Sequence, residues 1–354
     1  MTLTRRKNGF VMLENGLVQV YTGKSMKYNF APLGLSLRAA GQGLRTLIAC
    51  FVPHELMDDE AQMVSFYLKP YLTVDHTAIE GVHPRGILDR DRILKLFHEA
   101  RRAVLASLYD VVILNGIGQT MALGIISLDD VLTLMREKPS NVELVLTGPG
   151  VSESVIDKAD LVTELEVHSI SYDQKNGDAL GNQGSIEVVT GNGKGKTTYC
   201  LGKSMLYSSI GIRCAFLQFI KSPKPYGEVK AIQMIPNIDI KTMGEGFLGH
   251  HPHSHKRRHI DAARRAWEKC LREIFSLKYG MIVMDELNTA TFHGLVNPDR
   301  VRELLFLKPQ NLHLMLSGRN AHVDVMAAAS SVIEMKEVKH PYRKGIKARK
   351  GIEF

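Results

Sequence analysis

The sequence contains one pattern twice, and this repeat limits the folds that the chain can adopt. An apolar run that ends in Thr-Gly stands at residues 17–23 and again at 186–191, so that Gly23 and Gly191 lie 168 positions apart. Further on, residues 109–116 parallel residues 279–286 at an offset of 170. A chain of 354 residues is long enough for two domains of ordinary size. We therefore expect two copies of one domain, 1–168 and 185–354.

Each copy alternates short β-branched runs with helical stretches. This alternation predicts an α/β fold, a mostly parallel sheet with helices on both faces. Asn297 and Pro298 are typical of a helix start, because asparagine caps a helix and proline suits its first turn. Segment 169–184 is polar and without periodicity, which is typical of a linker. In the second copy we expect strands at 185–190, 213–219, 238–243, 280–285, 311–317 and 331–336, and helices from Thr197, from about Lys256, from Pro298 and from Asn320.

A glycine-rich run follows the first strand of the second copy. It reads Thr190-Gly191-Asn192-Gly193-Lys194-Gly195-Lys196-Thr197-Thr198. Peptide N–H groups and a helix N-terminus can surround phosphate oxygens only where side chains do not crowd them, and alternating glycines meet this need. Lys196 then supplies a mobile positive charge, and Thr197 a hydroxyl ligand for magnesium. We expect residues 191–198 to bind nucleotide phosphates, and the chain to hold two tandem P-loop (RecA-like) domains.

Two acids and one arginine follow other expected strands of the second copy. Asp285 and Glu286 end the strand 280–285, and a carboxylate beside a phosphate loop is where open α/β sheets hold ligands and magnesium. The alternative is a surface acid at a strand end. Arg319 follows the strand 311–317 and is a candidate phosphate contact.

The first copy lacks these groups. Where the second copy has residues 193–198, the first has Ser25-Met-Lys-Tyr28-Asn-Phe30, so that Tyr28 replaces Lys196 and side chains stand where phosphate oxygens need bare backbone. Asn115 and Gly116 replace the acidic pair, and magnesium would have few protein anchors there. We expect residues 1–168 to be a non-catalytic copy without a working phosphate loop.

Four segments of the second copy together resemble one known family. They are TGNGKGKTT at residues 190–198, QFIK at 218–221, MDEL at 284–287 and the closing GIEF. In this order they resemble the ATP:corrinoid adenosyltransferases. The resemblance covers nearly all of residues 184–354, whereas residues 15–168 share only a weaker similarity with the second half.

The resemblance implies a reaction and a set of roles. Co(I) of a reduced corrinoid attacks C5′ of ATP and triphosphate leaves, with one active site per chain. Lys196, Thr197 and Glu286 carry the catalysis. Thr197 and Glu286 hold Mg²⁺ (or Mn²⁺) with Asp285 in support, and a flavoprotein reductase supplies the electrons. Two other functions stay open: a non-catalytic ATP- or corrinoid-binding sensor or carrier, and an ordinary P-loop ATPase or kinase.

The corrinoid side of the site departs from the family's pattern. Phe247 falls on the family's phenylalanine, but Gly249 stands where tryptophan is expected. The four histidines of the run 250–255 indicate either a mobile loop or a zinc site. The closing segment 339–354 either covers the nucleotide or forms a structural edge.

Members of the family work as dimers, which implies an internal pseudo-dimer of the two copies. The family's pattern has an arginine on the helix after the loop; the second copy has Leu206 there, and the first copy keeps Arg38. Arg38 either serves the surviving site from across the interface or is a solvated helix residue.

Composition excludes several classes of partner. The formal net charge is +8, concentrated in residues 256–273 and 336–354, yet no basic patch alternates with aromatics, so we expect small anionic ligands and no nucleic acid. No apolar run approaches the ~20 residues that span a bilayer, and the first residues lack a hydrophobic secretion segment. We expect a cytoplasmic protein without a membrane partner, in which Trp267 lies in the core and the four single cysteines are reduced.

Overall fold

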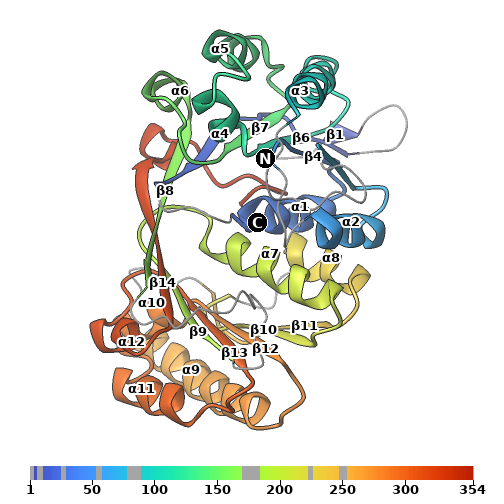
Figure 1. Ribbon diagram of the computed structural model, residues 1–354. Coiled ribbons are helices and arrows are strands. Elements are labelled where there is room, and N and C mark those ends of the chain that lie inside the picture. Colours follow the sequence, from blue (N-terminus) through green and yellow to red (C-terminus); the bar gives the residue numbers. More distant parts are fainter. Residues whose placement is uncertain are drawn as a thin grey trace.

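The computed structural model describes residues 4–5, 11–24, 29–52, 58–77, 89–169, 184–221, 226–246 and 253–353 (Figure 1). Twelve strands form one sheet in the order β11-β10-β12-β13-β9-β14-β8-β3-β7-β6-β4-β5. The short strands β1 (Thr4–Arg5) and β2 (Val11–Met12) pair separately. Most of the expected linker, residues 170–183, lies outside the described residues.

The two halves of the large sheet have the same strand order. The C-terminal half reads β11-β10-β12-β13-β9-β14 and the N-terminal half β5-β4-β6-β7-β3-β8, and neighbours within each half are parallel. The strands of the N-terminal half are β3 (Val18–Thr22), β4 (Thr46–Cys50), β5 (Leu72–His76), β6 (Val111–Asn115), β7 (Glu143–Thr147) and β8 (Leu161–Ser169). Those of the C-terminal half are β9 (Ile186–Thr190), β10 (Cys214–Gln218), β11 (Ile238–Thr242), β12 (Met281–Asp285), β13 (His313–Ser317) and β14 (Ser331–Lys339).

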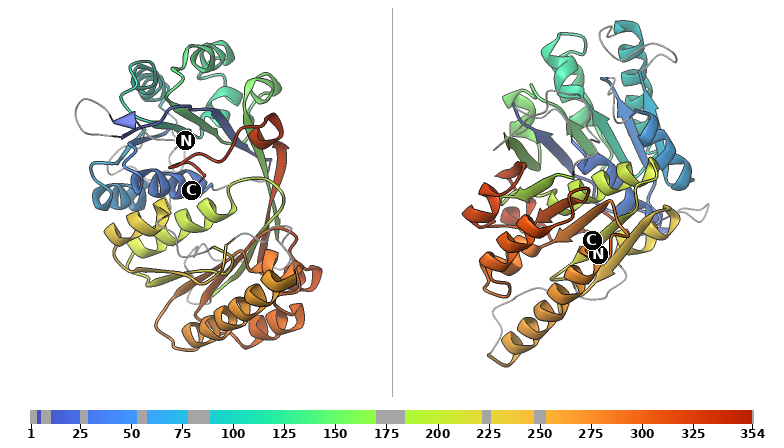
Figure 2. Two further views of the ribbon diagram at one scale, coloured as in Figure 1. Left: turned by 180° about the vertical axis from the view of Figure 1, so that it is seen from behind. Right: turned by 60° about the horizontal axis from the view of Figure 1, so that its bottom comes forward.

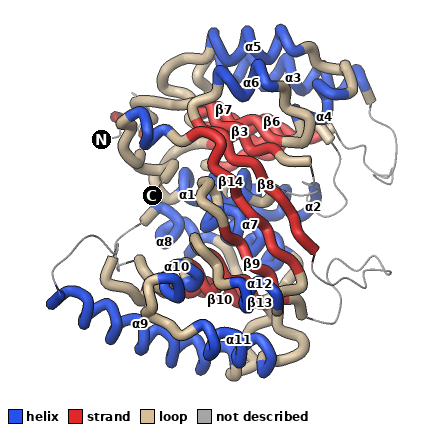
Figure 3. The backbone as a smooth tube through the Cα atoms, turned by 90° about the vertical axis from the view of Figure 1, so that its left-hand side faces the viewer, coloured by secondary structure: helices blue, strands red, loops and turns tan. Residues whose placement is uncertain are grey.

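One antiparallel pairing joins the halves. β8 and β14 are each 9 residues long and run side by side in opposite directions, with Ser169 opposite Ser331 and Glu166 opposite Glu334 (Figure 3). Their extra length carries each strand beyond its own half and into contact with the other. The two parallel sheets are therefore hydrogen-bonded into a single one, an arrangement that the strand pattern alone does not reveal.

Helices cover both faces of the sheet, as expected, and divide the core into three. One core, shared by the two copies, lies between the half-sheets and contains α1, α2, α7 and α8; each half has a second core on its outer face (Figures 1 and 2). The inner helices are α1 (Ala31–Ala40), α2 (Asp58–Tyr67), α7 (Lys196–Ser209) and α8 (Gly227–Ala231). The outer helices are α3 (Arg90–Leu105), α4 (Ile117–Ala122), α5 (Leu128–Glu137) and α6 (Glu153–Lys158) in the N-terminal half, and α9 (His253–Ile274), α10 (Leu287–Phe292), α11 (Pro298–Leu307) and α12 (Val323–Ala327) in the C-terminal half.

Equivalent positions of α1 and α7 meet about a local twofold axis. A Cβ on Gly34 would lie 1.8 Å from the carbonyl oxygen of Thr198, and one on Gly202 would lie 1.9 Å from that of Phe30. Gly34 and Gly202 are 168 positions apart, as are Phe30 and Thr198. The helices can approach this closely only because neither glycine has a side chain.

The repeat also extends to a half-buried lysine in each copy. Lys138 Nζ donates to the carbonyl oxygens of Gly16, Pro139 and Val142 at 2.9, 3.1 and 2.8 Å. Its counterpart Lys308, 170 positions on, donates to those of Gly184, Pro309 and Leu312 at 3.1, 3.2 and 3.0 Å. Burial lowers the pKa of both ammonium groups.

Most element predictions are confirmed. Each of the six strands expected in the second copy is present. The helix expected from Asn320 begins at Val323, because the side chain of His322 caps it, and α8 and α10 were not predicted. Trp267 lies in the outer core at 6% exposure, and Cys50, Cys200, Cys214 and Cys270 are buried thiols that form no disulfide. Over the described residues, every helix is too short or too polar to cross a lipid bilayer.

Candidate nucleotide site

The phosphate loop connects β9 to α7 and lies against β14. Gly191 and Gly195 have φ angles of 95° and 110°, a region that glycine adopts without strain. Gly193 donates its N–H to the carbonyl of Met335 at 2.7 Å, and a Cβ on Gly193 would lie 2.8 Å from the same oxygen. The glycines are therefore required by the close approach of β14 as well as by the expected ligand.

Lys196, the first residue of α7, points back into this loop. Its ammonium donates to the carbonyl oxygens of Gly191 at 2.8 Å and Gly193 at 2.7 Å. Burial lowers the pKa of Lys196 to about 8, and the carboxylate of Glu286 partly opposes this. A nearby anion would favour the protonated ammonium, so the geometry suits a phosphate.

Asp285, at the end of β12, accepts hydrogen bonds from residues of α7, β10 and β13. Its Oδ1 accepts from Thr197 Oγ1 at 3.0 Å and from Ser317 Oγ at 2.6 Å, and its Oδ2 accepts from Gln218 Nε2 at 3.3 Å. Asp285 is fully buried at 0% exposure. Because parallel strands end at one edge of the sheet, β10, β12 and β13 bring these groups to the start of α7.

Glu286 is held in an unusual backbone conformation beside Asp285. Its φ is 64°, a value that residues other than glycine, asparagine and aspartate rarely adopt. The N–H of Glu286 donates to Ser317 Oγ at 3.1 Å, and Thr289 Oγ1 donates to its carboxylate at 2.5 Å. Burial and the charge of Asp285 raise the pKa of Glu286. Two carboxylates that repel one another next to the Thr197 hydroxyl form an oxygen-only set of the kind that suits Mg²⁺ or Mn²⁺.

The N-terminal copy keeps this hydrogen-bond scaffold without its charges. Thr147 Oγ1 donates to Asn115 Oδ1 at 2.7 Å and accepts from the N–H of Gly116 at 3.0 Å. These residues stand 170 positions before Ser317, Asp285 and Glu286. Tyr28, which replaces Lys196, lies outside the described residues.

The other expected phosphate contacts lie around the loop. Lys194 Nζ donates to Glu353 Oε1 at 3.0 Å, and Thr198 Oγ1 donates to the carbonyl of Gly195 at 2.8 Å. Asn192 and Arg319 are exposed. The N–H of Arg319 donates to Thr289 Oγ1 at 3.0 Å, and its guanidinium is near enough to lower the pKa of Lys196.

Arg38 is buried at the interface between the copies, so the expectation of a solvated helix residue is wrong. It is 6% exposed, and its Nε donates to Glu228 Oε2 at 3.1 Å, while Lys221 Nζ donates to Glu228 Oε1 at 2.5 Å. Burial alone would raise the pKa of Glu228, but the two cations lower it to about 2. Lys221 belongs to the QFIK segment, so Arg38 of the first copy and this segment of the second copy share one buried carboxylate.

Several site residues were not assigned a role from the sequence. Gln218 and Ser317 each end a strand, as Asp285 does, and that position was the available signal. Nothing local indicated Tyr21 of β3, whose ring lies against the phosphate loop: a Cβ on Gly195 would be 2.9 Å from Tyr21 Cε1. The segment that contains Phe247 and Gly249, and the side chains of the histidine run 250–255, lie outside the described residues.

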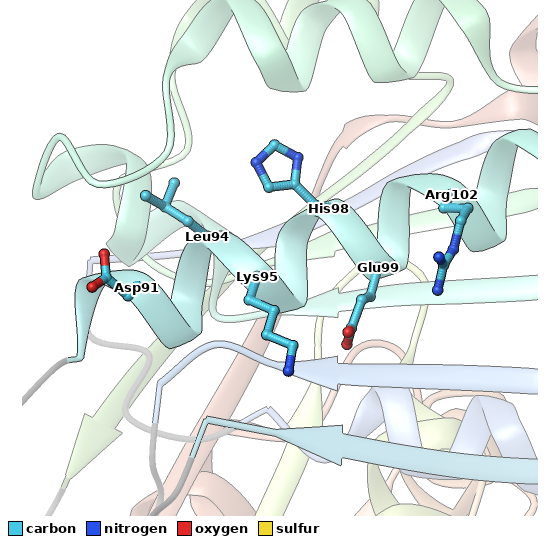
Figure 4. A pocket seen from close by; sticks show the side chains of 6 residues that line it. All are labelled: Asp91, Leu94, Lys95, His98, Glu99 and Arg102. Atoms are coloured by element: carbon cyan, nitrogen blue, oxygen red, sulfur yellow. The ribbon is translucent and has the colours of Figure 1, made fainter.

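Two other surface features occur among the described residues. A shallow hollow on the outer layer follows a single helix, α3 (Figure 4). Glu166, His168 and Glu334 gather where β8 pairs with β14, but all three are partly exposed and Glu166 already pairs with Lys336. The hollow is lined by Asp91, Leu94, Lys95, His98, Glu99 and Arg102.

A family model matches the chain twice. The model of the ATP:corrinoid adenosyltransferases BtuR/CobO/CobP covers residues 14–180 and again residues 182–354. The chain belongs to this family. The two matches meet between β8 and β9, as a tandem duplication of one family domain requires.

Relatives of this adenosyltransferase-family chain fall into two groups by length. An uncharacterised protein of Nostoc sp. is 27% identical and aligns over 96% of this chain and 95% of its own. The corrinoid adenosyltransferase of Pseudomonas aeruginosa is 34% identical over 54% of this chain and 93% of its own, and that of Sinorhizobium sp. is 37% identical over 49% and 81%. Among solved structures, a KaiC-like protein of Pyrococcus horikoshii covers 45% of this chain at 15% identity and a TM-score of 0.31.

Proposed function

We propose that this protein transfers the 5′-deoxyadenosyl group of ATP to Co(I) of a reduced corrinoid, with release of triphosphate, at one active site in the C-terminal copy. The observation that supports this most is the contrast between the copies. Asp285 and Glu286 stand on a hydrogen-bond scaffold beside Lys196 in the C-terminal copy, and the N-terminal copy has this scaffold with Asn115 and Gly116 in place of the two acids. Relatives named corrinoid adenosyltransferase support the choice of substrates.

The residues of the site match the needs of that reaction. Co(I) is itself the nucleophile, so no general base is required, and the protein must bind the leaving triphosphate and align C5′. The loop N–H groups other than that of Gly193, which donates to Met335, would bind the phosphates together with Lys196, and Lys194 and Arg319 would add positive charge at the rim. Magnesium, or manganese, would neutralise further phosphate charge when bound, and Thr197 and Glu286 would hold it with Asp285 in support.

The corrinoid, the electron donor and the pairing of the copies complete the proposal. Phe247 is assigned to the corrinoid side, and the Co(I) state would be supplied by a flavoprotein reductase. The shared core and the α1–α7 contact support an internal pseudo-dimer, in which Arg38 serves the surviving site from the N-terminal copy.

An oxygen-free assay tests the function. The protein is given ATP, magnesium and a chemically reduced corrinoid, and the cobalt–carbon absorption spectrum is followed together with the phosphate products. Alkylated corrinoid and intact triphosphate are expected in equal amounts. Release of inorganic phosphate alone would point to an ordinary ATPase, and binding of both substrates without turnover would point to a sensor or carrier.

Matched variants locate the site. Lys196→Ala and Glu286→Gln are expected to lower turnover at least about 100-fold, whereas Asn115→Ala in the N-terminal copy should leave it within about twofold. Equal losses in both copies would contradict a single site in the C-terminal copy.

A further inference from the structure

The C-terminal tail of the chain returns to the N-terminal half. After β14, residues 340–353 run back between the half-sheets and end beside α1 (Figures 1 and 3). Ile352 is buried in the core shared by the two copies, and its carbonyl oxygen accepts from Arg38 Nη1 at 3.3 Å. The tail is therefore part of the interface between the copies.

A buried ion pair attaches this tail to the N-terminal copy. Arg349 Nη1 donates to Glu143 Oε2 at 2.6 Å and Arg349 Nη2 to Glu143 Oε1 at 2.8 Å, a two-point contact. The side chains are 3% and 0% exposed. A carboxylate buried this deeply is strongly unfavourable without a cation, so Glu143 and Arg349 require one another.

The tail also contacts the phosphate loop, through Glu353. Glu353 accepts from the N–H of Arg349 at 2.7 Å and from Arg349 Nη2 at 3.1 Å, and its Oε1 also accepts from Lys194 Nζ at 3.0 Å. Burial would raise the pKa of Glu353, but Arg349 and Lys194 outweigh it and hold the pKa below its usual value. An unbroken series of ion pairs thus runs from Glu143 to Lys194.

A second line of contacts leads from Glu143 to the neighbouring loop residue. Gln19 Nε2 donates to Glu143 Oε1, and Tyr21 OH donates to Gln19 Oε1 at 3.1 Å. The ring of Tyr21 then lies against Gly195, where a Cβ would be only 2.9 Å from Tyr21 Cε1. Two consecutive loop residues, Lys194 and Gly195, are therefore each in contact with a side chain, Glu353 and Tyr21, that is linked by hydrogen bonds to Glu143.

The C-terminal copy has no equivalent device among its described residues. Its counterpart of Glu143 is His313, 170 positions on, whose Nδ1 accepts from the N–H of Ser185 at 3.2 Å. Burial lowers the pKa of His313 to about 4, so the ring is neutral near pH 7. The counterpart of Gln19 is Glu187, which instead pairs with Lys203 at 2.7 Å. Among the described residues, the N-terminal copy therefore supports the loop of the C-terminal copy, and no matching contacts lead the other way.

We propose that the N-terminal copy positions the phosphate loop, with Glu143 acting through Arg349 and Glu353 to fix the Lys194 ammonium where it meets the nucleotide's phosphates. This rests on the nucleotide site proposed above for the C-terminal copy. Glu143, Arg349 and Glu353 are positioning residues, because they act through Lys194: Glu353 contacts it directly, and Glu143 and Arg349 hold Glu353 in place. The N-terminal copy, which lacks the phosphate-loop sequence, would thus still contribute to nucleotide binding.

The test is ATP binding by the full chain, measured by calorimetry without a corrinoid. Glu143→Gln keeps the side-chain shape and removes the charge, and we expect the Kd for ATP to rise about tenfold. Glu353→Gln breaks the contact to Lys194 but leaves the Arg349–Glu143 pair intact, so it covers the case in which Glu143→Gln fails to fold. Glu137→Gln, which removes an exposed pair with Arg101 in the same copy, should leave the Kd within about twofold.

A double-mutant cycle separates positioning from general destabilisation. In a Lys194→Gln background, Glu143→Gln and Glu353→Gln should cause no further change in the Kd, because their effect passes through Lys194. Independent, multiplying losses would overturn the proposal. Tighter ATP binding by Glu353→Gln would also overturn it, because Glu353 would then be holding Lys194 away from the phosphates. If the unaltered protein bound no ATP, the proposed function itself would fail, whereas ATP binding without adenosyl transfer would leave the positioning role testable.

Discussion

Glu286 and Gly116 occupy the same left-handed backbone position in the two copies, with φ angles of 64° and 84°. Glycine meets this conformation without strain, and glutamate does not. The strain is retained only in the copy that carries the acidic pair. Strained backbone that persists in one of two otherwise matching sites indicates a functional requirement.

The Glu286→Gly variant should therefore be more stable and less active than the natural chain. Relief of the left-handed strain should contribute about 1 kcal/mol, and loss of the repulsion with Asp285 should add to it. Thermal unfolding and adenosyl transfer would be measured together. Glu286→Gln, which keeps the strain, is the control. A lowered melting temperature for Glu286→Gly would contradict this account.

Ser317→Ala should impair the site, whereas Thr147→Ala should not. Ser317 Oγ holds both the carboxylate of Asp285 and the N–H of Glu286, and loss of such a supporting contact lowers activity or metal affinity about 10–100-fold. Thr147 makes the same two contacts in the N-terminal copy, where its loss should cost only about 1 kcal/mol of stability. Steady-state kinetics and chemical denaturation of the two variants check this. Equal activity losses would disprove it.

Gly202→Ala should separate α1 from α7. A Cβ there would lie 1.9 Å from the carbonyl oxygen of Phe30, so the helices must move apart, at a cost of about 3 kcal/mol. Gly211, just past the end of α7, has φ 87° but open space around it, and Gly211→Ala should cost only about 1 kcal/mol. Urea denaturation would compare the two. Similar costs would mean that the close helix contact is not needed.

The Glu228 carboxylate should stabilise the interface above about pH 4.5 and lose this effect in acid. Its pKa falls from 4.5 to about 2 on folding, because Arg38 and Lys221 outweigh the effect of burial. The unfolded chain therefore binds more protons between these values, and stability falls as the pH drops through them. Removing one partner of a buried pair costs about 3–5 kcal/mol. Glu228→Gln should therefore be clearly less stable than the natural chain at pH 7 and nearly equal to it at pH 2, as followed by urea denaturation. A difference independent of pH would refute the assignment.

The sequence predicts those parts of the molecule that depend on local pattern. The six strands of the second copy follow from short apolar runs with turn residues between them, and the loop at 191–198 follows from the need for bare backbone near phosphate. The antiparallel pairing of β8 with β14 could not be predicted, because both strands read as ordinary ends of their own domains. Which edges meet depends on long-range packing.

The same limit applies to the site. Lys196, Asp285 and Glu286 are detectable because their residue types and their places after strands carry the chemistry. Glu143 and Tyr21 are not, because an acid at the start of a buried strand and a tyrosine within one are common in any core. Their proposed role depends on long-range packing, where Arg349 of the C-terminal tail meets Glu143 and the ring of Tyr21 meets Gly195.

Joining the two copies in one polypeptide removes a constraint that a symmetric homodimer must obey. In a homodimer, one codon specifies both sides of the interface, so a residue that helps on one side appears on the other whether or not it is useful there. Here position 143 is glutamate and its counterpart 313 is histidine. Fusion in one polypeptide would let one copy specialise as support, the role proposed above, while the other retains the phosphate loop. Substitutions in the two halves can then be selected independently.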